Sequence, residues 1–324
     1  MNHAIRFHRT GGPEVLQWEA AALPAPAAGE VRLRHHAVGL NYIDTYHRSG
    51  LYPLALPSGL GLEAAGVVEA VGEGVDEFAP GDRVAYTSGP LGAYAEARNI
   101  PAAHLVRLPA GISFEQGAAM MLQGVTAQYL LRSTYPVQAG DVVLIHAAAG
   151  GVGSIMVQWA KLLGATVIGT VGTDDKAVQA RALGCDHVIV YTRERFPARV
   201  REITGGEGVA VVYDSVGRDT FIDSIACLRR RGMMVSFGNA TGAVAPFDCA
   251  LLAKAGSVYV TRPGLFDYIA SRAELLGRAG ELFDVVGSGK VKIAINQRYA
   301  LKDAAQAHRD LEARRTTGST VLLP

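Results

Sequence analysis

The sequence predicts an α/β protein in which a doubly wound parallel sheet is inserted into a β-rich domain. Three observations support this fold class. Residues up to about 120 form short apolar segments broken by Gly, Pro and Asp, strands alternate with helices from about residue 124, and a helix and a strand end the chain. We therefore expect residues 1–123 and 265–324 to form the β-rich domain, and residues 124–264 to form the parallel sheet with its helices.

The β-rich part begins with alternating patterns and turn residues. Residues 30–34 alternate polar and apolar side chains, as a half-buried strand does. Residues 65–72 are mostly apolar, and Gly74 and the segment Pro80-Gly81-Asp82 supply turns after them. Short strands with such turns predict a small antiparallel barrel.

The middle of the chain repeats a strand-then-helix pattern. Residues 141–147 form an apolar strand, and Val152, Ile155 and Trp159 follow it at helical spacing. Five further strands are expected at residues 165–171, 187–191, 209–214, 233–238 and 257–261. Six strands joined by helices complete a doubly wound sheet. The tail predicts helices at 268–287 and 302–312 and strands at 291–295 and 319–323, which we expect to return to the first domain.

Composition narrows the possible partners and the compartment. The 324 residues include 31 basic and 30 acidic side chains, a net charge of +1, which gives no electrostatic reason to expect nucleic acid or an anionic membrane. Cys185, Cys227 and Cys249 lie far apart without a CxxC pair, so we expect no disulfide framework and a reducing cytoplasm. Neither a signal peptide nor an apolar run of about 18 residues is evident.

A glycine-rich loop follows the first strand of the alternating region. The segment Ala148-Ala149-Gly150-Gly151-Val152-Gly153 is the pattern G-x-G-x-x-G with Ala in its first position, and a helix follows directly. Gly150 would let the backbone approach a pyrophosphate, Gly153 would let the helix pack close to the strand, and the helix N-terminus supplies free N–H groups. The motif alone is weak, but its place between strand and helix predicts a dinucleotide site.

The end of the next strand favours NADPH over NADH. An NAD site usually has an acidic residue about 20 residues beyond the loop, whereas Thr170, Gly172 and Thr173 are neutral and small. Lys176 could pair with a 2′-phosphate, although a solvated helix lysine is the alternative. The neighbouring Asp174 and Asp175 come later than the strand tip, so we expect them in the first turn of the helix.

No metal site is expected. The cysteines are wrongly spaced for catalytic or structural zinc, and no HExxH or Cys/His cluster appears. His35 and His36 are adjacent, and on a strand they would point to opposite faces. Without a Lewis acid an unactivated alcohol is hard to deprotonate, so the chemistry should suit an acceptor that is already electron-poor.

The loop and its surroundings resemble a known family. The string from Gly140 to Lys161, with its Ala148-Ala149-Gly150-Gly151-x-Gly153 core and Gln158, is similar to the signature of the quinone oxidoreductase/zeta-crystallin group of zinc-free medium-chain dehydrogenase/reductases. The segments that resemble the bacterial NADPH:quinone reductases in particular are residues 41–46, 48–53, 57–61, 213–219 and 235–239. In the zinc enzymes a His-Glu pair follows the glycine that matches Gly61, and Leu62-Glu63 stands there in this chain.

This resemblance implies a GroES-like catalytic domain around an inserted Rossmann domain, and a homodimer. The residues that it places at the nicotinamide and the quinone are Asn41, Asp44, Tyr46, Tyr52 and Thr126. The residues that it places along the cofactor are Gly150, Gly151, Val152, Gly153, Gly172, Thr173, Lys176, Tyr191, Ser215, Phe237, Gly238, Asn239 and Arg262. The tyrosines could instead be ordinary packing aromatics, and Asn41 could instead cap a turn.

The resulting hypothesis is NADPH-dependent reduction of a quinone or a similar electron-poor small molecule, by hydride or by stepwise electron transfer, with a proton from water or a tyrosine hydroxyl. A zinc-free reductase of activated alkenes, such as enones or enoyl thioesters, is the nearest alternative. An NADPH-binding protein with a structural or RNA-binding role is the alternative from another class. The physiological acceptor, the number of electrons in each step, the proton donor and the dimer surface stay open.

Overall fold

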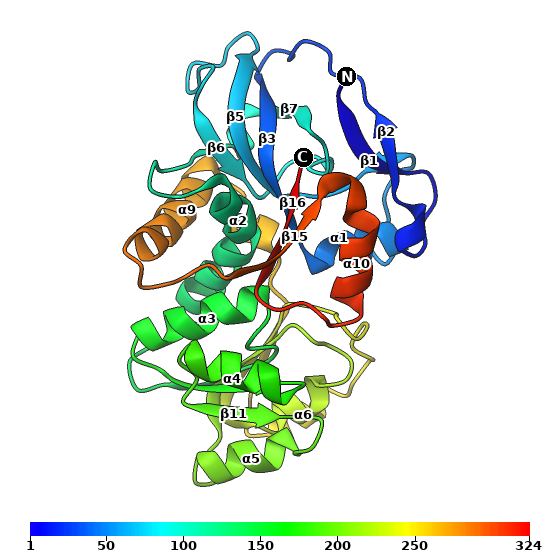
Figure 1. Ribbon diagram of the computed structural model, residues 1–324. Coiled ribbons are helices and arrows are strands. Elements are labelled where there is room, and N and C mark those ends of the chain that lie inside the picture. Colours follow the sequence, from blue (N-terminus) through cyan, green and yellow to red (C-terminus); the bar gives the residue numbers. More distant parts are fainter. The chain divides into compact units, whose positions relative to one another are not determined.

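The computed structural model describes all 324 residues, which form two compact units (Figure 1). The first unit contains Met1–Val125, Ser271–Gly287 and Ile293–Pro324, and the second contains Thr126–Ala270 and Ser288–Lys292. The boundary after Val125 falls inside helix α2 (Phe114–Tyr129), which continues into a π-turn at Leu130–Thr134. The domain limits expected from the sequence, 1–123 with 265–324 and 124–264, stay a proposal.

The first unit is built on a curved sheet with strand order β15-β16-β3-β5-β6-β8, and β7 also pairs with β3. These strands are β3 (Glu30–Leu40), β5 (Ala64–Val71), β6 (Arg83–Tyr86), β7 (Ala97–Pro101), β8 (Val106–Arg107), β15 (Ile295–Ala300) and β16 (Ser319–Leu323). All their pairings are antiparallel except that of β15 with β16. A second, small sheet joins β1 (His3–Phe7), β2 (Gln17–Ala20) and β4 (Ser58–Gly59).

The tail does return to the β-rich unit. β16 pairs with β3 through Thr320 opposite Leu40, and α10 (Ala304–Glu312) and α9 (Arg272–Gly287) belong to the same unit. Two details differ from the sequence prediction. The expected strand at 291–295 lies later, at β15, and the expected helix at 268–287 is divided into α8 (Leu265–Tyr268) and α9 by a break at residues 269–271.

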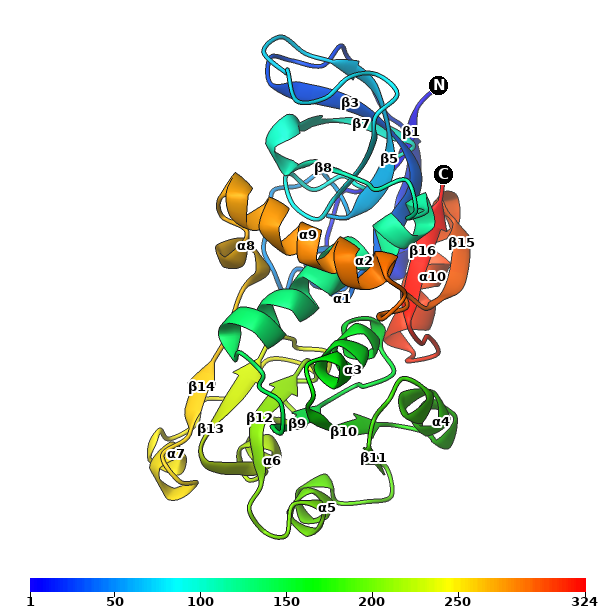
Figure 2. The same cartoon turned by 90° about the vertical axis from the view of Figure 1, so that its left-hand side faces the viewer.

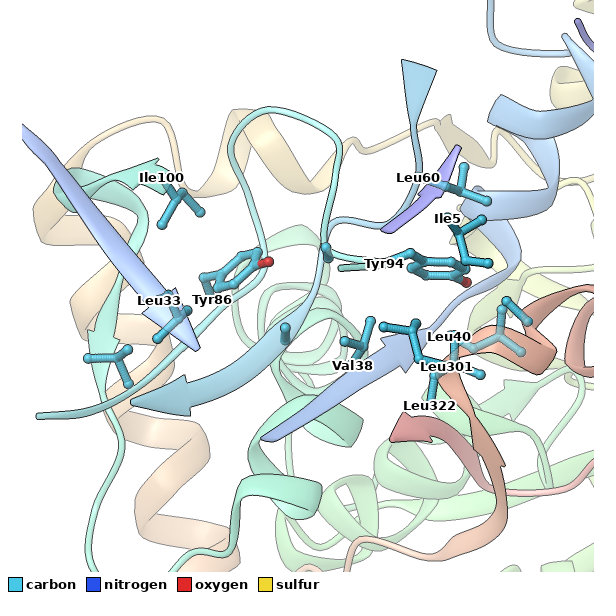
Figure 3. Packing of buried hydrophobic residues seen from close by; sticks show 14 of the residues in the cluster. Ile5, Leu33, Val38, Leu40, Leu60, Tyr86, Tyr94, Ile100, Leu301 and Leu322 are labelled. Carbon is cyan, nitrogen blue, oxygen red and sulfur yellow. The ribbon is translucent and has the colours of Figure 1, made fainter. Parts of the chain in front are cut away.

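Buried side chains from both ends of the chain fill the first unit. Figure 3 shows Leu33 beside Tyr86 and Ile100, and Val38 and Leu40 beside Leu301 and Leu322 from the tail. All of these residues are at most 2% exposed. The C-terminal segment is therefore part of the core and not an appendage on its surface.

The second unit is a six-stranded parallel sheet with strand order β11-β10-β9-β12-β13-β14. The strands are β9 (Val142–Ile145), β10 (Thr166–Val171), β11 (His187–Val190), β12 (Val209–Asp214), β13 (Leu228–Ser236) and β14 (Tyr259–Thr261). The second and third strands lie on one side of the first, and the fourth to sixth lie on the other, which is the doubly wound order. The predicted fold class is confirmed in this topology.

Helices cover both faces of this parallel sheet. Figure 2 shows α3 (Gly151–Leu162) and α4 (Asp174–Ala182) on one face, and α5 (Phe196–Ile203) and α6 (Phe221–Ile225) on the other. The short helix α7 (Ala250–Lys254) precedes β14. The carboxyl ends of β9 and β12 are neighbours at the point where the strand order reverses, which is where open α/β sheets bind ligands.

α2 and α9 are the longest helices, with 16 residues each. No helix has both the length and the apolar surface that a membrane span requires.

Candidate active site

The glycine-rich loop forms the turn from β9 into α3. Ala147 has a φ of 51°, the left-handed conformation that reverses the chain, and the N–H of Gly150 donates to the carbonyl oxygen of Ala147 at 2.8 Å. Gly150 is the N-cap of α3, so Gly151, Val152 and Gly153 form its first turn. The N–H groups of a first turn have no acceptor inside the helix and point toward the sheet edge, where they can bind an anion.

Two glycines of this loop have different roles. A Cβ on Gly153 would lie 2.2 Å from the carbonyl oxygen of Ala147, so any side chain there would push α3 away from the loop. A Cβ on Gly150 would lie 3.2 Å from the same oxygen, and its φ of −82° is open to every residue. Gly153 is therefore required by packing, whereas a side chain on Gly150 would meet only Ala147, and the expected role of Gly150 at a ligand stays a prediction.

The end of β10 is neutral, as the sequence predicted. Thr173 is the N-cap of α4, and its hydroxyl accepts a hydrogen bond from the N–H of Lys176 at 3.3 Å. Asp174 and Asp175 lie in the first turn of α4, and Asp174 pairs with Arg193 at 2.7 Å.

Gly172 and Tyr191 are neighbours at this edge, because a Cβ on Gly172 would lie 2.8 Å from the tyrosine hydroxyl. Tyr191 is 38% exposed. Gly172 and Tyr191 thus lie together at this edge, and Thr173 and Lys176 begin α4 directly after it. Small, hydroxylated and basic groups without a carboxylate at the strand tip fit an adenosine with a 2′-phosphate.

The loops after β12 and β13 also meet at the carboxyl edge. Asp214 fixes the first of them, because one of its carboxylate oxygens accepts from the N–H groups of Val216 and Gly217 at 2.7 and 3.1 Å. A Cβ on Gly238 would lie 2.4 Å from the carbonyl oxygen of Ser215, so the two loops are in close contact. The expected residues Phe237 and Asn239 flank Gly238, and Arg262 is exposed directly after β14.

In the first unit Asn41 begins helix α1 (Tyr42–Ser49), which the sequence did not predict. Asn41 and Asp44 form a capping box: the Asn41 side chain accepts from the Asp44 N–H, and Asp44 Oδ2 accepts from the Asn41 N–H at 2.9 Å. The Asn41 amide also donates to Glu63 Oε2 at 2.7 Å and accepts from Gln123 Nε2 at 3.1 Å. The alternative that Asn41 is a cap is confirmed, and its contact with a substrate stays a prediction.

Two fully buried carboxyl groups lie in this network. Burial raises the pKa of Asp44 to about 7, against the hydrogen bonds that it accepts from Asn41 and Tyr94. Burial likewise raises the pKa of Glu63 to about 8, against hydrogen bonds from the Asn41 amide and from the N–H of Leu122 at 2.7 Å. Glu63 was not among the expected site residues, and its only signal was its place after Leu62, where the zinc enzymes have a His-Glu pair.

The tyrosines around α1 form one aromatic group. The rings of Tyr46 and Tyr52 are 5.3 Å apart in an edge-to-face arrangement, and Tyr42 lies 6.1 Å from Tyr46. The N–H of Tyr52 donates to the carbonyl oxygen of Tyr46 at 3.1 Å, which ties the loop after α1 to the helix. Thr126, the remaining expected residue, is buried on α2 in the second unit.

The histidines and cysteines are accounted for individually. His35 is buried and contacts the carbonyl oxygen of Ala95 at 2.7 Å, whereas its neighbour His36 stacks on Phe114 with ring centres 4.3 Å apart. The two imidazoles thus have separate surroundings. No three His, Cys, Asp or Glu side chains are grouped as a metal site requires, and all three cysteines are free thiols.

Comparison with known proteins identifies the family. Residues 27–110 match the alcohol dehydrogenase GroES-like domain, and residues 151–276 match the zinc-binding dehydrogenase family. The chain is 53% identical to a quinone oxidoreductase of Pseudomonas aeruginosa over 100% of both chains. It is 54% identical to quinone oxidoreductase 1 of Escherichia coli K12 over 99% of both. It is also 48% identical to a 2-haloacrylate reductase of a Burkholderia species, over 99% of this chain and 98% of the relative.

Solved structures agree with these relatives. A quinone oxidoreductase of Pseudomonas syringae superposes with a TM-score of 0.98 at 54% identity, over 100% of both chains. The Escherichia coli quinone oxidoreductase in complex with NADPH superposes with a TM-score of 0.98 at 53% identity, over 99% of this chain and 100% of that one. The family resemblance read from the glycine-rich loop is thereby confirmed, and the chain belongs to the quinone oxidoreductase group of the zinc-free medium-chain dehydrogenase/reductases.

Proposed function

We propose that this chain is an NADPH-dependent enzyme that reduces quinones without a metal. The observation that carries the proposal is the glycine-rich loop at the reversal point of the parallel sheet, next to a neutral strand tip, in a chain that matches quinone oxidoreductases along its whole length. The NADPH in the superposed Escherichia coli complex supports the choice of cofactor.

The chain's own residues would hold the cofactor along the carboxyl edge of the sheet. The first-turn N–H groups of Gly151, Val152 and Gly153 would bind the pyrophosphate, and Gly150 leaves room for it. Lys176, with Gly172, Thr173 and Tyr191, would surround the 2′-phosphate and the adenosine. Ser215, Phe237, Gly238, Asn239 and Arg262 would line the remaining path, because they follow β12, β13 and β14 at the same edge. NADPH, when bound, supplies the hydride.

On the substrate side, aromatic faces suit a flat and electron-poor ring. Tyr46 and Tyr52 form a ready aromatic pair on and after α1, and Thr126 would lie on the nicotinamide side. Asn41 and Asp44 would contribute by holding α1, because their side chains are hydrogen-bonded inside the first unit. The main contribution of the protein is then orientation, with a proton from water or a tyrosine hydroxyl.

We expect Glu63 to shape the site through its fixed contacts. Its carboxyl group is fully buried, and a pKa of about 8 keeps it neutral at neutral pH. Both of its oxygens accept hydrogen bonds from fixed neighbours, Leu122 and Asn41. The carboxyl group of Glu63 therefore holds the Asn41 amide and the N–H of Leu122 in fixed positions.

One relative supports a second candidate function. The 2-haloacrylate reductase at 48% identity covers nearly the whole chain, and a 2-haloacrylate is an activated alkene by its name. Reduction of an activated alkene would use NADPH bound at the same edge of the parallel sheet, with the alkene in place of the quinone as the acceptor.

We further propose a homodimer in the cytoplasm. β14 is an edge strand that pairs only with β13, and Tyr259 on it is 58% exposed, so its outer edge can pair with another chain. Three free thiols suit a reducing compartment. Sedimentation velocity would report a monomer if the dimer proposal is wrong.

Quinone-dependent oxidation of NADPH tests the proposed function. Purified protein should oxidise NADPH rapidly with 1,4-benzoquinone and much more slowly when NADH replaces NADPH. A 2-haloacrylate and an enone are assayed under the same conditions. Faster turnover of these alkenes than of the quinone would move the acceptor to the second candidate, and NADPH binding without any turnover would favour a non-catalytic role.

The glycine-rich loop is tested by Gly150→Val. The φ of −82° admits any residue, and the Cβ at 3.2 Å from the carbonyl oxygen of Ala147 needs only a small local shift, so the protein should fold, whereas the added side chain would occupy the proposed space of the pyrophosphate. We expect a loss of NADPH affinity of at least about a hundredfold, measured by fluorescence titration. Gly277→Ala is the matched control, because a Cβ on Gly277 in α9 meets nothing within 4 Å. Affinity equal to that of the control would reject the loop as the cofactor site.

Glu63 predicts a loss of stability at alkaline pH. Its folded-state pKa of about 8 lies above the ordinary value of 4.5 for a glutamate, so the folded protein holds this proton more tightly and the free energy of unfolding falls as the pH rises toward 8. Burial lowers the pKa values of His35 and His308 to about 3, so these residues make the free energy of unfolding rise with pH, but only below the ordinary histidine pKa of 6.5. Above pH 6.5 the buried carboxyl groups should therefore dominate.

Glu63→Gln should flatten this decline between pH 6.5 and about 8, by roughly 1 kcal/mol for each pH unit. The overall stability should fall by about 1–3 kcal/mol, because the new amide nitrogen faces a donor. Urea unfolding at several pH values measures both quantities. Glu73→Gln, in an exposed position, is the control and should keep the slope of the unsubstituted protein. The same slope in Glu63→Gln would contradict the assignment.

A further inference from the structure

A chain of buried side chains links α10 to α1 within the first unit. Arg48 Nη1 lies 2.9 Å from His308 Nδ1, His308 Nε2 lies 3.1 Å from the hydroxyl of Tyr94, and this hydroxyl donates to Asp44 Oδ2 at 3.0 Å. All four side chains are at most 2% exposed. At its outer end Arg48 also donates to both carboxylate oxygens of Glu312, at 2.6 and 3.1 Å. The two helices lie side by side in Figure 1.

The hydrogen bonds in this chain of side chains can run in only one direction, from donor to acceptor. A guanidinium has donors and no acceptor, so Nδ1 of His308 must accept from Arg48. The neutral imidazole then carries its proton on Nε2 and donates it to the Tyr94 oxygen, which leaves the Tyr94 proton for Asp44. Burial, together with the charge of Arg48, lowers the pKa of His308 to about 3, which keeps the ring neutral. Every hydrogen bond thus points from the cation toward Asp44.

This chain is not a route for protons. Arginine keeps its protons in proteins, so nothing can pass from Glu312 through Arg48 to His308. At the other end, Asp44 contacts the backbone N–H of Asn41, which is not exchanged in catalysis. A row of aligned donors that ends on a buried carboxyl group instead favours its ionised form.

The chain holds both ends of α1. At the N-terminus, Asp44 needs Oδ2 as an acceptor to close the capping box on Asn41. Toward the C-terminus, the Arg48 side chain is fixed by α10, and its Nε donates to the carbonyl oxygen of Gly11 at 3.1 Å. A helix of eight residues is too short to be stable alone, so these anchors decide where its tyrosines lie.

We propose that Arg48, His308 and Tyr94 are positioning residues for the quinone-side helix α1, and that they act through Asp44. The proposal rests on the proposed function for its activity measurements. The groups in direct contact with Asp44 are the N–H of Asn41 and the hydroxyl of Tyr94, and Glu63, from the segment before β5, interacts with it electrostatically. Packed against Tyr94 are His308 from α10 and, one step further, Arg48 of α1 with Glu312 of α10. The Asn41 N–H and the Tyr94 hydroxyl both donate to Oδ2 of Asp44, and both hydrogen bonds are stronger when the carboxyl group is ionised, so activity should fall as the pH decreases through the pKa of Asp44.

Tyr94→Phe is the main test. It removes the donor to Asp44, which should raise the pKa of Asp44 and move the acid limb of kcat/KM upward by about one pH unit. At pH 7 we expect about a tenfold lower kcat/KM, mostly through the KM for the quinone. Tyr86→Phe is the control, since Tyr86 is equally buried and contacts His35 Nε2 at 3.1 Å, outside this chain. An acid limb and KM in Tyr94→Phe equal to those of the control would overturn the proposal.

Two milder variants test the direction of the chain. His308→Gln can accept from Arg48 with its amide oxygen and donate to Tyr94 with its amide nitrogen, so it should keep kcat/KM within about threefold and leave the acid limb in place. Glu312→Gln leaves the Arg48 charge less compensated, and the acid limb should move slightly to lower pH. A His308→Gln protein as impaired as Tyr94→Phe, or an upward shift in Glu312→Gln, would contradict the assigned direction. These variants carry the test if Tyr94→Phe does not fold.

Nitrogen-15 NMR of the unsubstituted protein gives a readout without any activity. His308 should be neutral with its proton on Nε2, and should stay so to about pH 4. A proton on Nδ1 would overturn the chain even in an active quinone reductase. Absence of quinone turnover with the Nε2–H form in place would instead reject the proposed function, and would leave the chain as an anchor of α1.

Discussion

The contact between Gly153 and the carbonyl oxygen of Ala147 is the constraint on which the cofactor edge depends. Only a residue without a side chain allows α3 to begin this close to the end of β9. That approach points the first N–H groups of the helix toward the space above the sheet. The strands then spread to both sides of β9, so the loops after β10, β12 and β13 are arranged around the same point. If α3 shifted, these loops would stay in place, but the N–H groups of the first turn of α3 would no longer point into the space that the loops surround.

In the first unit, hydrogen bonds to buried side chains fix the position of helix α1, whereas close packing fixes α3 in the second unit. Asp44 and Glu63 are completely buried acids. The fold tolerates each of them because fixed donors reach its carboxyl group. The Asn41 amide serves both sides, as it donates to Glu63 and accepts from Gln123. Removal of one member leaves a buried partner unsatisfied, which costs more than the bond itself contributes.

Local sequence could predict the parallel sheet and the glycine-rich loop because strand, turn and helix follow each other within about 20 residues. It could not predict the network around α1. Arg48 and Glu312 are 264 positions apart in sequence, Tyr94 and His308 are 214 apart, and neither pair leaves a periodic pattern. Glu63 was missed for the same reason, since its partners Asn41 and Leu122 lie 22 and 59 positions away. The short helix α1 was also missed, because its capping box is a geometric feature that only a folded Asp44 completes.

The pairing of β16 with β3 has a consequence for synthesis on the ribosome. Val321 and Leu322 are translated after the whole of the second unit and cover the edge of β3 at Gly39 and Val38, and Leu322 enters the core beside Leu301. The second unit is nearly continuous from Thr126 to Ala270 and can fold while the tail is still being translated. The strand β3, although translated early, keeps an open edge, and Arg48 lacks its partners on α10, until residues 304–323 emerge. The first unit is therefore begun before the second and completed after it, and in that interval its open strand edge is available to pair with other chains.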